Sequence, residues 1–261
     1  MSPGAGTYCY CLVQRRTPPS LGRAPAGPPG LAPPRSLPVG ESLWLVAANA
    51  PLARFGADAI NARLRDLTWV STCAMAHEAV IEHVARSGAV VPMKLFTLFT
   101  SDARALAHVA RSRARLGRIL KRVAGRQEWG VRLTLDESRA AAAARRGRRA
   151  GLGGTGAGTR FLLRKRAEHG LAGRLAARAR VEAERLYRAL RLQADAARRR
   201  PPLAAPAGTR LLLDAAFLVP AGGAARFRST ARAIARRLAT GGYRLTLTGP
   251  WPPYNFVGDR G

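Results

Sequence analysis

A short stretch in the first third of the chain brings histidine, cysteine and glutamate side chains together. His77, Glu78 and His83 could bind a metal or move a proton, and Cys73 could act as a thiol nucleophile beside His77. Two histidines that bind one metal from a helix stand four residues apart, whereas His77 and His83 stand six apart. Cys73 lies one helical turn before His77, but no third group is visible to orient the histidine toward the thiol. His77 instead falls on an apolar stripe, so we expect a hydrogen-bonded histidine in the core.

Two other patterns suggest a metal or a nucleotide, and both are incomplete. Cys9 and Cys11 are expected on one face of a strand, without the further ligands that a tetrahedral site needs. The glycine-rich residues 151–159 lack the Gly-Lys-Ser/Thr ending of a phosphate-binding loop, because the next lysine is Lys165. The sequence therefore predicts no catalytic residue, no metal, no cofactor and no small-molecule substrate, and we expect a protein that is not an enzyme.

The charge of the chain is strongly positive. It carries 44 basic residues, almost all of them arginine, against 15 acidic ones, a net charge of +29. Such a field favours acidic partners, but a coding bias toward arginine explains it as well, because the arginines are spread over predicted helices. An alternative function is a basic nucleic-acid-binding protein, although no known nucleic-acid-binding motif is present. We expect nucleic acid to bind non-specifically at most.

The segment near the C-terminus, "TGPWPPYNFV" (residues 248–257), is rich in proline and aromatic residues. Proline fixes the backbone and blocks a regular strand or helix, so the segment should leave its strand in an extended path. Trp251, Tyr254 and Phe256 then offer large apolar surfaces at a small entropic cost. Two roles stay open for these three residues: they dock the tail on the protein itself, or they contact a partner.

The elements that position these residues follow from the hydrophobic periodicity. In the first half, strands are predicted at residues 7–14, 42–48, 89–96 and 128–136, and helices from residue 72 to about 87 and from 102 to about 124. Ser101 is expected to cap the second of these helices. Residues 15–40, rich in proline and glycine, are expected to form a mobile loop.

The second half predicts a long helix over about residues 161–199, a strand at 209–220, a helix at about 223–239 and a strand at 243–248. We therefore expect an α+β fold with two domains. The expected parts are an N-terminal α+β domain (1–137), a linker (138–158), a C-terminal α+β domain with the long helix (159–248) and a tail (249–261). No apolar run is long enough to span a membrane and no secretory signal is visible, so we expect a cytoplasmic protein with free thiols.

Several stretches, taken in order, resemble one known family. "VVPMKLFTLFTSD" (residues 90–102), "LKRVAGRQEWGVRL" (120–133) and the tail "TGPWPPYNFV" are similar to the central and terminal motifs of the gas vesicle GvpF/GvpL proteins. "TYCYCLVQ" and "HEAVIEHV" fit that family's opening strand and first helix. The sequence departs from the family at Phe96-Thr97, where the usual Phe-Gly-Thr lacks its glycine.

The resemblance implies a C-terminal domain like a modified ferredoxin fold, followed by the extended tail. It also implies a non-enzymatic assembly factor or minor component of gas vesicles, without catalytic residues or cofactors. The implied partners are the small hydrophobic shell protein and other gas vesicle accessory proteins, and the implied location is the cytoplasm and the gas vesicle.

Overall fold

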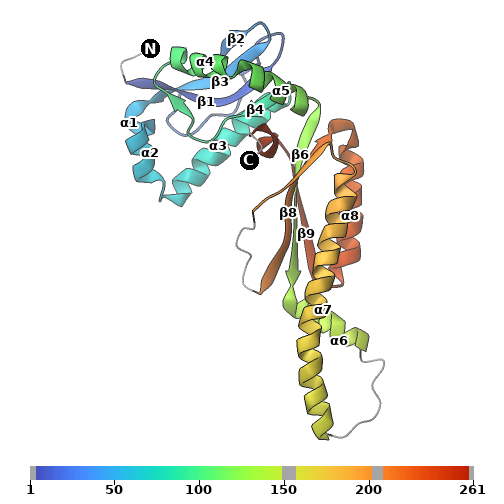
Figure 1. Ribbon diagram of the computed structural model, residues 1–261. Coiled ribbons are helices and arrows are strands. Elements are labelled where there is room, and N and C mark those ends of the chain that lie inside the picture. The colour runs from blue at the N-terminus through green and yellow to red at the C-terminus, as the bar shows by residue number, and fades with distance from the viewer. Residues whose placement is uncertain (1–3, 149–156, 202–207, 259–261) are drawn as a thin grey trace. The chain divides into compact units, whose positions relative to one another are not determined.

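The computed structural model describes residues 4–148, 157–201 and 208–258 (Figure 1). The fold mixes helices with two antiparallel sheets, in agreement with the expected α+β class. Contacts along the chain group it into two compact units. The first contains Met1–Arg126 together with Trp251–Gly261, and the second contains Gln127–Pro250.

The first unit is built on a five-stranded sheet. Its strands are β1 (Ala5–Gln14), β2 (Arg35–Gly40), β3 (Leu43–Pro51), β4 (Ala89–Pro92) and β5 (Leu98–Phe99). They follow the order β2-β3-β1-β4, and β5 also pairs with β1. The central strand β1 is buried from Gly6 to Val13, which explains its nearly continuous apolar sequence. The expected strands at 7–14 and 42–48 are confirmed as parts of β1 and β3.

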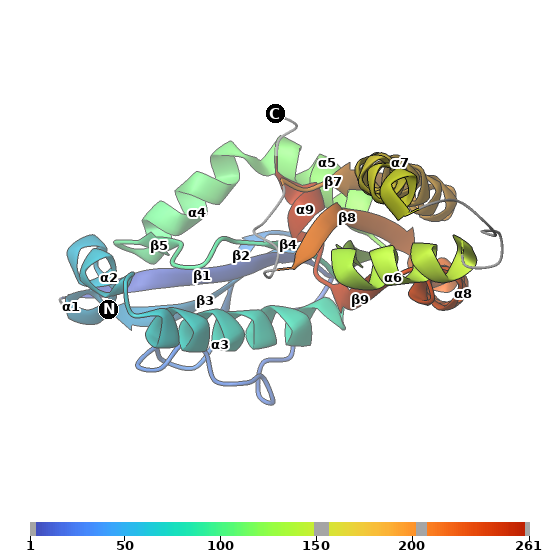
Figure 2. The same ribbon diagram turned by 90° about the horizontal axis from the view of Figure 1, so that it is seen from below.

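Helices cover both faces of this sheet. The helices of the unit are α1 (Leu52–Phe55), α2 (Ala57–Arg63), α3 (Leu67–Ala85), α4 (Asp102–Arg111), α5 (Arg113–Val123) and α9 (Tyr254–Val257). Figure 2 shows α3 against one face and α4 with α5 against the other. Ser101 caps α4 as expected, since its hydroxyl accepts a hydrogen bond from the Arg104 N–H at 3.3 Å. The single helix expected from residue 102 to about 124 is two helices, which meet at Ser112.

The segment at residues 15–40 differs from the expected mobile loop in two ways. Its end forms the edge strand β2, in which Pro38 lies opposite Trp44 of β3. An edge strand tolerates proline because the missing N–H can fall on the side of the strand that has no neighbouring strand. The preceding residues are also anchored: Pro19 and Pro28 are buried, and the Ala32 N–H donates to the Asn49 carbonyl at 3.0 Å.

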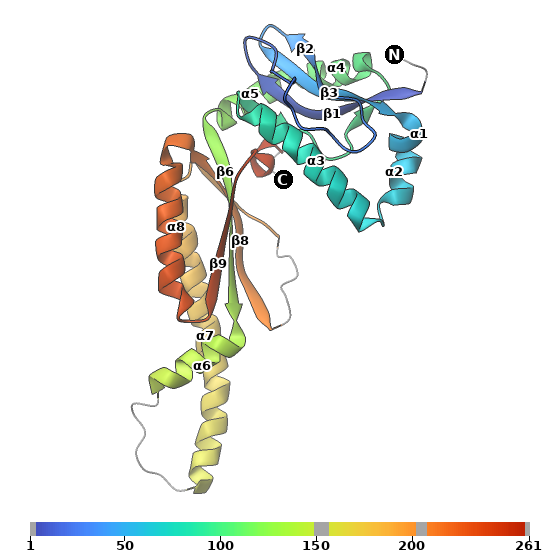
Figure 3. The same ribbon diagram turned by 180° about the vertical axis from the view of Figure 1, so that it is seen from behind.

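The second unit is built on a four-stranded sheet in the order β7-β8-β6-β9. Its elements are β6 (Arg126–Asp136), α6 (Glu137–Arg148), α7 (Ala157–Arg191), β7 (Ala196–Arg199), β8 (Thr209–Pro220), the short 3-10 helix η2 (Ala221–Gly223), α8 (Ala224–Ala239) and β9 (Tyr243–Trp251). The strands expected at 209–220 and 243–248 and the helix expected at 223–239 are confirmed. Figure 3 shows α7 and α8 running along the same sheet.

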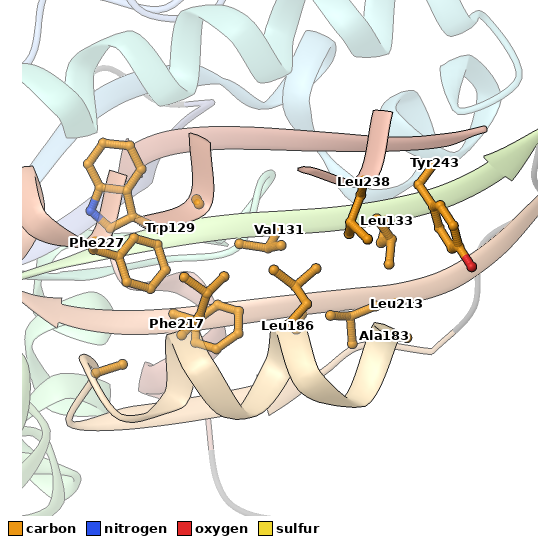
Figure 4. Close-up of a cluster of buried hydrophobic side chains, with 14 of the residues drawn as sticks. Trp129, Val131, Leu133, Ala183, Leu186, Leu213, Phe217, Phe227, Leu238 and Tyr243 are labelled. Atoms are coloured by element: carbon orange, nitrogen blue, oxygen red, sulfur yellow. The ribbon is translucent and has the colours of Figure 1, made fainter. Parts of the chain in front are cut away.

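The core of the second unit lies between this sheet and the helices α7 and α8. Trp129, Val131 and Leu133 of β6 point into it together with Phe217 of β8 (Figure 4). Leu186 of α7 and Phe227 of α8 meet these side chains from the helical layer. The ring of Phe217 on β8 lies 5.5 Å from that of Phe227 on α8 and 5.6 Å from that of Tyr187 on α7, centroid to centroid, so aromatic contacts join both helices to the sheet.

Two boundaries of the second unit differ from those expected from the sequence. Strand β6, expected in the N-terminal domain, belongs to the second sheet, so the units divide near residue 126 rather than at residues 138–158. Part of that expected linker is the helix α6, and residues 149–156 lie outside the described residues. The long helix ends at Arg191 rather than Arg199, because Ala196–Arg199 form β7 and pair with β8.

No helix among the described residues is both long enough and apolar enough to cross a membrane.

Candidate docking site of the C-terminal tail

The tail (residues 249–261) begins inside β9, whose last three residues are Gly249, Pro250 and Trp251. The Gly249–Pro250 peptide bond is cis, and Gly249 has a φ of 116°, a conformation that favours glycine. Pro252 and Pro253 follow and are both buried, and the one-turn helix α9 comes directly after them. The Tyr254 N–H donates to the Pro252 carbonyl at 2.8 Å, so the turn into α9 is made by the tail's own backbone.

Tyr254 attaches the tail to helix α3. Its hydroxyl donates a hydrogen bond to a carboxylate oxygen of Glu78, a residue 176 positions earlier in the sequence. Its ring packs against the buried cluster of the first unit. Burial, and then the hydrogen bond to the Glu78 carboxylate, raise the pKa of the Tyr254 phenol, so the group stays protonated and keeps donating.

Phe256 is the most deeply buried aromatic residue of the tail. It is 2% exposed, and α9 contacts β4 and α5. The guanidinium of Arg122 on α5 donates to the Phe256 carbonyl oxygen. Arg122 thus satisfies a carbonyl at the end of a helix too short to satisfy its own.

Trp251 is placed differently from the other two aromatic residues. It is 40% exposed, which makes it one of the exposed large apolar residues of the described chain. The three residues singled out from the sequence therefore divide: Tyr254 and Phe256 pack on the first unit, and Trp251 presents much of its surface to solvent.

The sequence did not single out the residues that receive the tail. In the sequence, Glu78 stands out only beside His77 as an acid–base candidate, and Arg122 is one arginine among many. Local periodicity does not indicate that either residue receives the tail, because each hydrogen bond joins segments more than a hundred residues apart. The family resemblance marked the tail but not the surface that holds it.

His77 lies next to this site and is a core residue, as expected. It is 3% exposed, its Nδ1 lies 2.8 Å from the Tyr8 hydroxyl, and its Nε2 lies 3.2 Å from the Met93 carbonyl. The carbonyl can only accept, so Nε2 carries the proton and Nδ1 accepts from Tyr8. Burial lowers the pKa of His77 to about 4, so the ring is neutral at physiological pH.

Phe96 also lies close to the Tyr8 hydroxyl. Its φ of 63° lies in the left-handed region, which is uncommon for a bulky residue. Its ring stacks on Trp69 with centroids 5.2 Å apart, and its N–H lies 3.5 Å from the Tyr8 oxygen. Phe96 belongs to the Phe96-Thr97 pair at which the sequence departs from the family motif, and the stacked ring helps to hold the unusual backbone in place.

The cysteines are placed apart from one another. Cys9 and Cys11 do not share a strand face as expected, because a register shift in β1 falls between them. Cys11 packs in the cluster beneath α3, whereas Cys9 lies near Asp102 and Arg35. Burial raises the pKa of the Cys9 thiol to about 12, and burial likewise raises the pKa of Cys11, so both are protonated.

Among the described residues no three histidine, cysteine, aspartate or glutamate side chains are grouped as a metal site. His83 points to the backbone, with its Nε2 3.0 Å from the Ser20 carbonyl. Most of the glycine-rich stretch 151–159 lies outside the described residues.

Comparison with known proteins relates nearly the whole chain to one group. Residues 6–258 match the family described as "Gas vesicle synthesis protein GvpL/GvpF". Gas vesicle protein L of Streptomyces sp. (strain CB03234) is 31% identical over 278 aligned residues, which cover 99% of this chain and 95% of that protein.

Two crystal structures share the fold. GvpF from Anabaena sp. PCC7120 matches with a TM-score of 0.70 at 15% identity, over 98% of both chains. GvpF from Microcystis aeruginosa matches with a TM-score of 0.69 at 16% identity, over 97% of this chain and 99% of that one.

Proposed function

The chain belongs to the gas vesicle GvpL/GvpF family, and from this premise we propose that it is a non-enzymatic assembly factor or minor component of gas vesicles. In this role it binds the small hydrophobic shell protein in the cytoplasm and supports vesicle formation together with other accessory proteins. The observation that carries the proposal is the match over nearly the whole length, from residue 6 to residue 258.

The physical need for such a protein follows from the shell. A wall that keeps water out of a gas space must expose apolar surface, and a free subunit with such a surface tends to aggregate. A protein that covers this surface until the subunit is incorporated removes the hazard. The comparisons offer no support for the alternative of a nucleic-acid-binding protein.

We assign the tail two tasks within this role. Tyr254 and Phe256 dock it on the first unit, with Glu78 and Arg122 as the receiving residues. Trp251, 40% exposed, is the tail residue that we propose for contact with a partner. An exposed tryptophan on a fixed backbone loses little freedom on binding and offers a large apolar surface.

We further propose that the two compact units are two domains and that the second is a modified ferredoxin-like domain. Its described elements follow the order strand, helices, strand, strand, helix, strand, with β6 and β8 in the centre of the sheet. This order is that of the ferredoxin-like motif, and the pair α6 and α7 in place of one helix is the modification.

The proposal is tested in a strain that lacks this gene and every related copy. We expect few or no gas vesicles and unaffected growth, measured by buoyancy and electron microscopy. Restoring the gene should restore the vesicles, and a normal vesicle yield in the deletion strain would contradict the proposal.

The shell-protein contact needs its own measurement. Tagged protein should co-purify with the shell protein, and Trp251→Ala should reduce the recovered shell protein while the protein itself stays folded. Arg232→Ala on the exposed surface of α8 is the matched control and should leave recovery unchanged. Undiminished recovery with the Trp251 variant would exclude this residue as a partner contact.

A further inference from the structure

A basic hollow lies on the first unit, beside the junction of α4 and α5. Its volume is about 680 Å³, and it is bounded by the end of the sheet at Gln14 and Leu43 and by the two helices. Leu43 and the buried Leu120 give it an apolar part, and Ala114 and Gly117 lie along its helical wall. A hollow with apolar walls and a few charged groups has the usual form of a binding site.

Four cationic side chains surround this hollow. Arg111, Arg113, Arg118 and Lys121 line it, and no acidic residue lines it with them. None of the four forms an ion pair with an acidic residue in the part of the chain that the structure describes. Other arginines of the protein are paired, as Arg35 is with Asp102 at 2.8 Å. Cationic side chains that gather without acidic partners create a positive potential, and this potential favours the binding of an anion.

Gly117 lines the hollow, and Gly40 lies close to one of the arginines that line it. A Cβ placed on Gly117, in the interior of α5, would meet no atom within 4 Å, so packing does not require glycine there. Glycine weakens a helix interior relative to alanine, and the missing side chain leaves the hollow wider. A Cβ on Gly40 would come within 2.9 Å of an Arg113 guanidinium nitrogen, so Arg113 lies across the turn between β2 and β3.

From these observations we propose that the hollow binds an acidic peptide segment of a partner protein. Guanidinium groups of Arg113 and Arg118 pair with its carboxylates in the forked geometry that arginine favours. Apolar side chains of the same segment lie against Leu43 and Ala114. The inference holds independently of the role in gas vesicles, because it depends on the charge and shape of this hollow.

Other occupants fit the hollow less well. Single-stranded nucleic acid is bound through stacked bases as well as phosphates, and no aromatic residue lines the hollow. A second copy of the chain carries a net charge of +29, and several of its acidic residues, such as Glu182 and Glu184, are already paired with arginine. A partner with a run of aspartate and glutamate supplies the charge that this chain lacks.

The test uses the full-length protein and a short fluorescein-labelled polyglutamate peptide, with its polyglutamine counterpart as the uncharged control. Binding is measured by fluorescence anisotropy at two salt concentrations. The double variant Arg113→Glu/Arg118→Glu should weaken peptide binding about tenfold, because two attractive pairs become repulsive. The double variant Arg232→Glu/Arg236→Glu on α8 changes the net charge equally and should weaken binding about twofold at most.

A third variant separates shape from charge. Gly117→Gln adds a neutral side chain on the wall of the hollow and should weaken peptide binding without changing the net charge. Circular dichroism checks that each variant is folded. We expect folding to be retained because all the altered positions lie on helix surfaces.

Three results would overturn the proposal. The first is equal loss in the two double variants, which would indicate attraction by the overall charge. The second is full binding to the Gly117 variant, which would place the peptide elsewhere. The third is a larger effect of the Arg113/Arg118 variant on a single-stranded oligonucleotide than on the peptide, which would identify a nucleic-acid site.

Discussion

The two compact units are assembled from the chain in different ways. The second unit is one continuous segment, Gln127–Pro250, whereas the first joins Met1–Arg126 to the last residues of the chain. The core of the first unit therefore includes Phe256 and packs against Tyr254, and it is complete only when the tail is docked. The tail is therefore a structural part of the first unit, although it follows directly from a strand of the second sheet.

The sheets of the two units also differ in how they are covered. Helices cover both faces of the first sheet, and β1 is buried on both sides from Gly6 to Val13. In the second sheet the side chains of β8 alternate: Leu213, Ala215 and Phe217 enter the core under the helices, and Asp214 faces away from it. The Asp214 carboxylate is nevertheless buried, and its pairing with Arg132 and Arg200 offsets the hydration that it loses.

The largest effect is expected from the tail. Phe256→Ala should lower the free energy of unfolding of the first unit by about 3–5 kcal/mol, since it removes a buried ring. Trp251→Ala is the control and should cost about 1 kcal/mol or less, because Trp251 is 40% exposed. Hydrogen exchange of the backbone amides of β1 and of β8, followed as denaturant is added, measures the stability of the first and the second unit separately. An equal loss of protection in β8 would contradict the assignment of the tail to the first unit.

The buried His77 of the first unit should give the next largest effect, a dependence of stability on pH. The pKa of His77 falls from 6.5 to about 4 on folding, so between these values the unfolded chain binds a proton that the folded chain does not. The free energy of unfolding of the first unit should therefore decrease as pH falls from 6.5 to 4, by roughly 3 kcal/mol in total.

The same unfolding series on His77→Gln measures this contribution. The variant has no group that titrates at this position, so its stability should fall less over the same pH interval. Parallel pH curves for the two proteins would show that His77 is not the source of the dependence.

The second unit is tested at the buried carboxylate of Asp214. The Asp214 carboxylate is 1% exposed, and it accepts hydrogen bonds from Arg132 at 3.0 Å and from Arg200 at 2.7 Å. Asp214→Asn should lower the stability of the second unit by about 2 kcal/mol, because hydrogen bonds to a charged group are lost. Thr246→Ala, on the exposed alternating positions of β9, is the control and should change stability very little. An unchanged melting curve for the Asp214 variant would show that the second unit does not depend on the pairing.

The smallest effect is expected at Gly117 in α5. Gly117→Ala should stabilise the first unit by about 1 kcal/mol, since the new Cβ meets no atom and alanine favours a helix. Thermal unfolding of this variant beside the wild type measures the change. A loss of stability would mean that the glycine is needed for packing and not for the space it leaves.

Local patterns in the sequence were sufficient for many elements of both units. The apolar run in β1, the alternation in β9 and the hydroxyl of Ser101 each predict their structure, because they depend on neighbouring residues. The place of His77 in the core followed from its position on an apolar stripe. The family followed from the order of short motifs, which survive when the rest of the sequence diverges.

Tertiary structure decided what depends on distant partners. Residues 196–199 resemble the end of an arginine-rich helix, and pairing with β8 makes them a strand. A register shift in β1 separates the faces of Cys9 and Cys11, which strict alternation would have joined. The tail motif was visible in the sequence, but its attachment to Glu78 was not, since a hydrogen bond between residues 176 positions apart forms only when the folded sheets and helices bring the two side chains together.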